Sequence, residues 1–252
     1  VSQAYAGAKA SLDGRGFRGF ERIDSLDGPT GIKTTIFYEH DFKRTSTRIR
    51  RAEQRQPNGL LISEMDNESA VQDHGFGVHY SFVATSVAKR YELDGSLVSA
   101  TTTATEMDDG GNVLSLRVDH GNGFAESTTS SFSDDPDRWL LGRLARSTVT
   151  RTATGRLPQS RTTAFTYDTE SGMLTTEVIE PDHPTLRLVK SYAHDAFGNV
   201  VQSTSSGPGI AARTTVTVPN TRGRYVASSS NPLGQTELKT YALGSVKSVT
   251  GP

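Results

Sequence analysis

The sequence of 252 residues predicts an all-β protein built from antiparallel hairpins. Three observations lead to this prediction: apolar and polar residues alternate with a period of two, helix-like apolar spacing is rare, and turn residues recur at short intervals. The clearest alternation places Phe76, Val78, Tyr80 and Phe82 at every second position. Successive side chains of a strand point to opposite sides of a sheet, so this run puts its large residues on one face.

The composition suits a sheet with at least one face in water. Apolar residues make up 34% of the chain and the mean hydropathy is -0.47, which is polar for a globular domain. The 8 Tyr, the 10 Phe and the many Val and Thr residues nevertheless favour strands over disorder.

Charge and cysteine content exclude several classes of function. The chain carries 27 basic and 28 acidic residues without a block of one sign, so no electrostatic footprint for nucleic acid exists. No apolar run reaches the roughly 18 residues of a membrane span. The absence of cysteine rules out disulfides and thiolate chemistry. The densest basic stretch, 43–55, is interpreted as a solvated strand-turn-strand.

Turns of one chemical kind separate the predicted strands. In each, Asp or Asn precedes Gly by three or four residues; the carboxylate or amide can accept a nearby backbone N–H, and Gly adopts positive φ readily. Turns of this kind lie at 108–112, 168–172, 195–199, 220–223 and 231–234. Gly172, Gly198 and Gly223 follow one another at about 25 residues, the double period of stacked hairpins. We therefore expect positive φ at Gly172 and Gly198.

One segment departs from the strand pattern. Asp135 and Pro136 resemble a helix N-cap followed by proline at the first helical position, and Gly142 would end a single turn. We expect a short helical corner near 134–142 whose apolar residues pack against the sheet: Trp139, Leu140 and Leu144. The predicted organisation is one continuous β architecture in three parts: 1–131, the corner 132–144, and the hairpin repeats 145–252.

The recurring Tyr, Asp and Gly resemble the tyrosine-aspartate (YD) repeats of the Rhs family. The residues that carry this resemblance are Tyr167, Asp168 and Gly172, then Tyr192, Asp195, Gly198 and Asn199, and, in a degenerate repeat, Gly234, Tyr241 and Gly244. Upstream, a glycine-aromatic run with Phe17 and Phe20, and later the segment of Trp139, are similar to the B component of insecticidal toxin complexes. The resemblance covers nearly the whole chain.

This resemblance implies an architecture and a role. In that family the repeats wind into a large curved or spiral sheet, a hollow β-shell that encloses a toxic effector. The chain would be a non-catalytic structural segment of such a shell, in a large secreted or cell-surface bacterial protein. Its partners would be other segments or subunits of the assembly and the enclosed effector. Three features depart from the family pattern: degenerate later repeats, no self-cleaving core segment and no effector domain.

Two other classes of function are weighed against this role. An exposed module that recognises a glycan or a receptor at a cell surface would show a contiguous exposed aromatic patch, whereas a scaffold would bury one aromatic per hairpin. An enzyme would need a nucleophile or an acid-base pair, but the chain has no Gly-x-Ser-x-Gly elbow and its paired carboxylates fall in turns. We expect no catalytic residue and no cofactor.

Metal binding is also not expected. His74 and His79 form the best histidine pair, across a glycine-rich turn, but helical metal-binding spacing is absent. The run 108–112 resembles a calcium loop without the downstream bidentate Glu, and turn chemistry accounts for its residues.

The two ends of the chain lead to a last expectation. The sequence begins at Val1 without Met and ends within the repeat pattern, so we expect a piece of a longer protein. Strands at cut edges leave backbone N–H and C=O groups unpaired, which favours edge-to-edge self-association.

Overall fold

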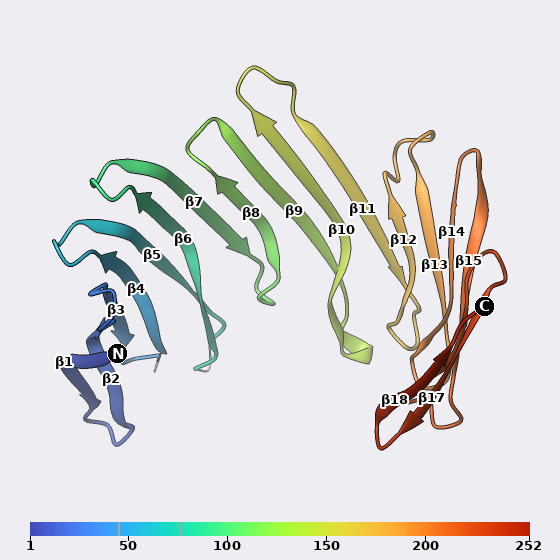
Figure 1. Ribbon diagram of the computed structural model, residues 1–252, viewed down its shortest axis with the longest axis horizontal. Helices are drawn as coiled ribbons and strands as arrows, with labels where there is room; N and C mark the ends of the chain where they lie inside the picture. The colour runs from blue at the N-terminus through green and yellow to red at the C-terminus, as the bar shows by residue number, and fades with distance from the viewer. Residues whose placement is uncertain (45, 76) are drawn as a thin grey trace. The chain divides into compact units, whose positions relative to one another are not determined.

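The computed structural model describes residues 1–44, 46–75 and 77–252, which are almost entirely β-strand (Figure 1). All eighteen strands belong to one sheet. Within the described residues the only helix is a 3-10 turn, η1 (Pro136–Arg138). The predicted all-β, antiparallel hairpin fold is confirmed. Phe76, which opens the alternating run of the sequence, lies outside the described residues.

The chain divides into two compact units. Unit 1 comprises Val1–Thr129 and Val149–Gln159, and unit 2 comprises Ser130–Thr148 and Ser160–Pro252. The first nine strands are β1 (Ser2–Ser11), β2 (Gly16–Leu26), β3 (Lys33–Asp41), β4 (Ser46–Arg55), β5 (Leu61–Asp73), β6 (His79–Tyr91), β7 (Leu97–Met107), β8 (Val113–Asp119) and β9 (Phe124–Asp135). The others are β10 (Leu140–Ala153), β11 (Gln159–Tyr167), β12 (Leu174–Ile179), β13 (Leu188–His194), β14 (Val200–Gly207), β15 (Ile210–Pro219), β16 (Val226–Ser230), β17 (Thr236–Ala242) and β18 (Ser245–Thr250).

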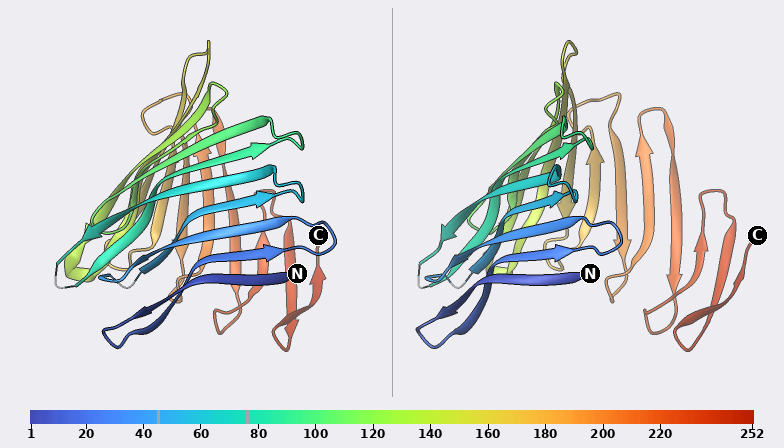
Figure 2. Two further views of the ribbon diagram at one scale, coloured as in Figure 1. Left: turned by 90° about the vertical axis from the view of Figure 1, so that its left-hand side faces the viewer. Right: turned by 60° about the vertical axis from the view of Figure 1, so that its left-hand side comes forward.

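Consecutive strands pair antiparallel along the chain. Each strand from β1 to β9, and again from β11 to β18, pairs with the next strand along the chain, and β9 also pairs with β10. Figure 2 shows the hairpins of unit 1 following one another, with short turns at their ends. Register shifts occur beside many turns, for example at Thr166/Tyr167 and Ala193/His194. A strand that bulges by one residue beside a glycine turn gives this pattern.

The sheet is held together without a conventional core. Among the described residues Ala125 is the only buried apolar residue, at 8% exposure, and Thr35 and Glu64 are the only buried polar ones. Stability must therefore come from ladder hydrogen bonds and cross-strand side-chain pairs, each worth roughly 0.2–1 kcal/mol. This organisation agrees with the polar composition of the sequence.

The two faces of unit 2 differ in chemistry. Direct register partners lie on the same face, and one face carries an unbroken row of hydroxyl residues across five strands: Thr166, Thr176, Ser191, Thr204 and Thr214. The hydroxyls of Thr204 and Thr214 are hydrogen-bonded at 2.9 Å. The opposite face presents Glu177, Lys190 and Tyr192. The in-register row of hydroxyl residues and the charged pair Glu177 and Lys190 therefore lie on opposite faces.

The helical corner is shorter than expected. The Asp135 carboxylate caps it by accepting the Arg138 N–H at 3.2 Å, and Pro136 occupies the first turn, both as the sequence predicted. The turn ends at Trp139, which is left-handed with φ 57°, and not at Gly142, which lies within β10.

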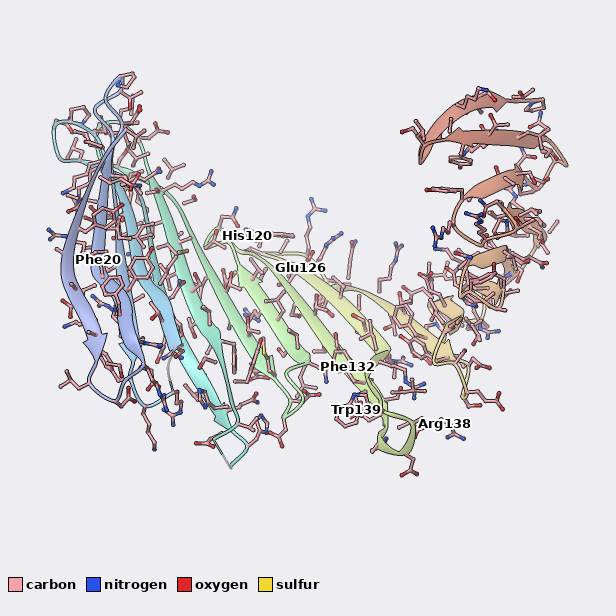
Figure 3. All side chains as sticks on the ribbon, turned by 90° about the horizontal axis from the view of Figure 1, so that it is seen from below. Phe20, His120, Glu126, Phe132, Arg138 and Trp139 are labelled. Carbon is pink, nitrogen blue, oxygen red and sulfur yellow. The ribbon has the colours of Figure 1, made fainter. Side chains whose placement is uncertain are left out.

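The expectation that Trp139 packs against the sheet is wrong: the residue is 80% exposed and lies at the corner (Figure 3). The physical reason is that the chain leaves the turn through the left-handed conformation of Trp139 itself, before strand β10 resumes. Leu140 and Leu144 are half-buried in β10.

No helix among the described residues is long and apolar enough to span a membrane.

Candidate functional site

The predicted repeat residues come together as hairpin turns held by a carboxylate. Asp195 Oδ1 accepts the N–H groups of Phe197 and Asn199, each at 2.9 Å, and the Gly198 N–H donates to the Asp195 carbonyl at 3.1 Å. The Asn199 side chain bonds the same carboxylate at 3.0 Å and lowers the pKa of Asp195. Gly198 has φ 85°, as predicted.

The preceding repeat turn uses the same chemistry. Asp168 Oδ1 accepts the N–H groups of Glu170 and Ser171 at 3.1 and 2.7 Å, and the Gly172 N–H donates to the Asp168 carbonyl at 3.0 Å. The bond from the Ser171 backbone is the main cause of the lowered pKa of Asp168. Gly172 has φ 71°, which confirms the expectation for both glycines.

The degenerate repeat keeps the turn with an amide in place of the carboxylate. Asn231 Oδ1 accepts the N–H groups of Leu233 and Gln235 at 3.0 and 3.1 Å. Gly234 and Gly244 have φ 78° and 84°. The same geometry also explains the run 108–112, where Asp108 Oδ1 accepts the N–H groups of Gly110 and Asn112 at 2.9 and 2.8 Å. These carboxylates are committed to their own turns.

The repeat tyrosines connect each strand to the one before it. Tyr167 on β11 donates to the Leu144 carbonyl on β10 at 2.9 Å, and Tyr241 on β17 donates to the Val226 carbonyl on β16 at 3.0 Å. Tyr192 on β13 donates instead to Glu177 Oε2 on β12 at 3.0 Å. All three rings are half-buried. A tyrosine therefore bonds adjacent strands in three of the four hairpins of β11–β18, whereas β15 and β16 carry no tyrosine.

A glutamate-lysine-tyrosine cluster repeats in the two units. In unit 1 the nearly buried Glu64 accepts the Tyr91 hydroxyl at 2.6 Å, Lys89 Nζ at 3.1 Å and Arg51 Nη2 at 2.9 Å. The Tyr91 hydroxyl is the largest cause of a lowered Glu64 pKa, and the bond raises the pKa of Tyr91. These bonds favour the ionised form of Glu64.

In unit 2 the corresponding cluster contains Glu177, Lys190 and Tyr192. Lys190 Nζ lies 3.4 Å from Glu177 Oε2, the oxygen that accepts the Tyr192 hydroxyl. In both units Lys and Tyr stand two residues apart on one strand, and Glu stands on the preceding strand. Sequence reasoning missed these clusters. The signal present in the sequence is the recurring Lys-x-Tyr, but its glutamate partner can be found only from the register.

A second unpredicted feature joins successive turns. A Cβ placed at Gly172 would lie 2.8 Å from Leu140 Cδ2, one at Gly198 would lie 3.1 Å from Met173 Cε, and one at Gly223 would lie 2.5 Å from Phe197 Cδ2. Gly198 and Gly223 are thus each covered by a side chain from the turn that precedes theirs on the same edge, and Gly172 is covered by Leu140 at the start of β10. Glycine is needed there both for positive φ and for this close approach.

The glycine-aromatic signature forms a small ring cluster on β1 and β2. The Phe20 ring lies 4.8 Å from the Tyr5 ring and 5.2 Å from the Phe17 ring, between centroids. Tyr5 and Phe17 remain 51% and 63% exposed, and Figure 3 marks Phe20 on its strand.

Of the two histidines weighed as a metal site, His79 has both ring nitrogens engaged in other bonds. His79 Nε2 lies 2.7 Å from the Arg44 carbonyl and Nδ1 lies 3.2 Å from the Gly77 carbonyl. Within the described part of the chain, no three His, Asp or Glu side chains gather as metal ligands.

The chain resembles known proteins in its fold and not in its sequence. Neither the protein-family models nor the curated proteins contain a match to the sequence. Solved structures do match in fold. The structure of TcdB2-TccC3-TEV has a TM-score of 0.72 and 11% identity, covering 99% of this chain and 20% of that chain. The fold is that of a Tc toxin segment.

Two further structures lead to the same conclusion. The Photorhabdus luminescens Tc holotoxin pore matches with a TM-score of 0.72 and 11% identity, over 99% of this chain and 20% of that chain. TcdB2-TccC3-Cdc42 matches with a TM-score of 0.66 and 11% identity, over 99% and 21%. The chain thus spans about a fifth of the length of the chains that it matches. The antiparallel architecture inferred from the YD-like repeats is the architecture of these toxin chains.

Proposed function

We propose that the chain is a non-catalytic structural segment of a β-shell, within a large secreted bacterial protein of the Rhs/YD-repeat type. That protein would be a toxin-complex component whose shell encloses a toxic effector. The observation that carries the proposal is the single sheet of stacked hairpins, which matches a fifth of the length of Tc toxin chains over 99% of its own.

The side-chain arrangement supports a structural role. The carboxylates of Asp168 and Asp195 are used by their own turns, and Glu64 is used by the strand that follows it. Tyr167 and Tyr192 each fasten a strand to its predecessor. Such a sheet can be extended by further hairpins, because each of these tyrosines bonds its own strand to the strand before it.

One observation favours the second candidate, an exposed binding module. The rings of Tyr5, Phe17 and Phe20 are contiguous, and two of them are more than half exposed. Stacked aromatic rings at a surface are suited to the apolar faces of sugar rings or to a receptor side chain. The repeat tyrosines Tyr167, Tyr192 and Tyr241 are half-buried, each in a different hairpin, which favours the scaffold.

Electron cryomicroscopy of the full-length secreted protein tests the proposal directly. We expect residues 1–252 to form part of the wall of a closed shell, with additional density inside it. A map in which this segment projects as a separate module, or in which no enclosed space exists, would overturn the shell function. Loss of binding to a glycan or receptor in the variant Phe17→Ser, with the fold intact, would instead establish the binding module.

A further inference from the structure

Described residues beside the β1–β2, β3–β4 and β5–β6 connections of unit 1 line a hollow of about 630 Å³ that the repeat chemistry does not use. Its lining contains four basic side chains and a single acidic one. The lining residues are Arg15, Arg18, Lys43, Arg44, Asp73, Gly75, Gly77 and His79. The chain as a whole has a net charge of -1, so this is a local concentration of positive charge.

The basic side chains of the hollow are only partly neutralised. Arg15 lies 3.3 Å from Asp13, and Arg44 lies 3.1 Å from Asp41 and 3.9 Å from Asp73. Neither Arg18 nor Lys43 has an ion-pair partner among the residues that the structure describes. The hollow therefore keeps at least two cations without a counter-charge.

Three shielded guanidinium nitrogens, one on Arg44 of the hollow and two on the nearby strand residue Arg48, are unsatisfied donors. Arg44 Nε, and Nε and Nη1 of Arg48, are shielded from solvent and donate to no acceptor in the described structure. A buried donor without a partner destabilises a protein, more so when it is charged. Such groups call for an ion or water that accepts their hydrogen bonds.

The guanidinium of Arg44 is held in place. Its Nη1 and its backbone N–H bond the two oxygens of Asp41 at 3.1 and 3.0 Å, and its carbonyl contacts His79 Nε2 of β6 at 2.7 Å. A donor fixed in this way loses little conformational entropy when an anion binds.

We propose that this hollow binds a tetrahedral oxyanion, the phosphate or sulfate group of a ligand. The four basic side chains come from residues in or beside two connections, β1–β2 and β3–β4, and can therefore approach an anion from two sides. Guanidinium groups form the strongest charge-assisted bonds to the oxygens of such an anion. The site goes beyond the shell function, because nothing in a structural segment requires an uncompensated cation cluster.

Isothermal titration calorimetry on the 252-residue chain tests the site. The probes are sodium phosphate, glucose 6-phosphate and a sulfated disaccharide, each at an ionic strength kept constant with NaCl. We expect saturable binding at one site. Arg18→Gln and Lys43→Gln should each weaken it about tenfold, because each removes one charge-assisted contact to the anion.

The controls separate a built site from general attraction and from misfolding. Arg161→Gln, which changes an arginine that is 77% exposed in unit 2, should leave the affinity unchanged. The two test variants break no ion pair, so their melting temperatures should not fall. Preference for one probe would assign the source of the anion, a phosphate ester or a sulfated glycan. Absence of saturable binding with all probes, or equal weakening by Arg161→Gln, would overturn the proposal.

Discussion

The contact between successive turns can be measured with two glycine variants of unit 2. Gly223 and Gly234 have similar left-handed backbones, with φ 65° and 78°. A Cβ at Gly234 would meet nothing within 4 Å, whereas a Cβ at Gly223 would lie 2.5 Å from Phe197 Cδ2. Gly234→Ala therefore isolates the backbone effect, and Gly223→Ala adds the collision with the neighbouring turn.

The expected magnitudes follow from these two geometries. An L-residue in the left-handed region costs roughly 1–2 kcal/mol, which is the expected loss of unfolding free energy for Gly234→Ala. The methyl must also displace the Phe197 ring, which is 69% exposed, and this adds about 1 kcal/mol, the low end for an overpacked site; Gly223→Ala should therefore lose about 2–3 kcal/mol. In a Phe197→Ala background the collision is absent, and Gly223→Ala should then cost no more than Gly234→Ala.

Equilibrium urea unfolding measures these differences as shifts of the midpoint at constant m-value. The coupling between Phe197 and Gly223 is obtained from the double-mutant cycle. Equal destabilisation by Gly223→Ala and Gly234→Ala in the wild-type background would refute the reasoning. So would a cost of Gly223→Ala that persists unchanged without the Phe197 ring.

Three further predictions concern acid, metals and sheet edges. Tyr91, Lys89 and Arg51 hold the pKa of Glu64 below its usual 4.5. The ionised Glu64 therefore stabilises the folded protein fully above pH 4.5, and this stabilisation is lost as the pH falls through the lower pKa of the folded state. Glu64→Gln should reduce the fall of the melting temperature at acid pH, and an unchanged fall would contradict this. Dialysis against a chelator should leave the melting temperature unchanged, whereas a fall of several degrees that Ca²⁺ or Zn²⁺ reverses would reveal a metal site. We predict that the outer edges of β1 and β18 pair between molecules, so light scattering should show mass rising with concentration; a strict monomer throughout would exclude edge pairing.

The turns were the part of the site most accessible from sequence. Asp195 bonds residues two and four positions away, and Asp168 bonds residues two and three positions away. Such bonds depend on a few neighbouring dihedral angles, so the identities of the residues nearly suffice to predict them. The positive φ of Gly172 and Gly198 follows for the same reason. The period-two alternation predicted the strands on equally local grounds.

The corner at Trp139 shows where local reasoning stopped. The cap at Asp135 and the proline after it were visible in the sequence, and both are present. The last residue of the turn was not predictable from these signals. Gly142 was expected to end it, but Trp139, three positions earlier, takes the left-handed position. Trp139 therefore stands 80% exposed instead of packing on the sheet.

The strands, the turns and the need for glycine in them could be predicted from the residues alone, because these features depend on side-chain alternation and on bonds within four residues. Which groups from separate hairpins meet depends on the three-dimensional fold. Tyr91 reaches Glu64 across 27 positions of sequence, and Phe197 covers Gly223 from the preceding turn. Both contacts depend on strand register and on the bulges that shift it, and a shift of one residue moves every side chain to the opposite face.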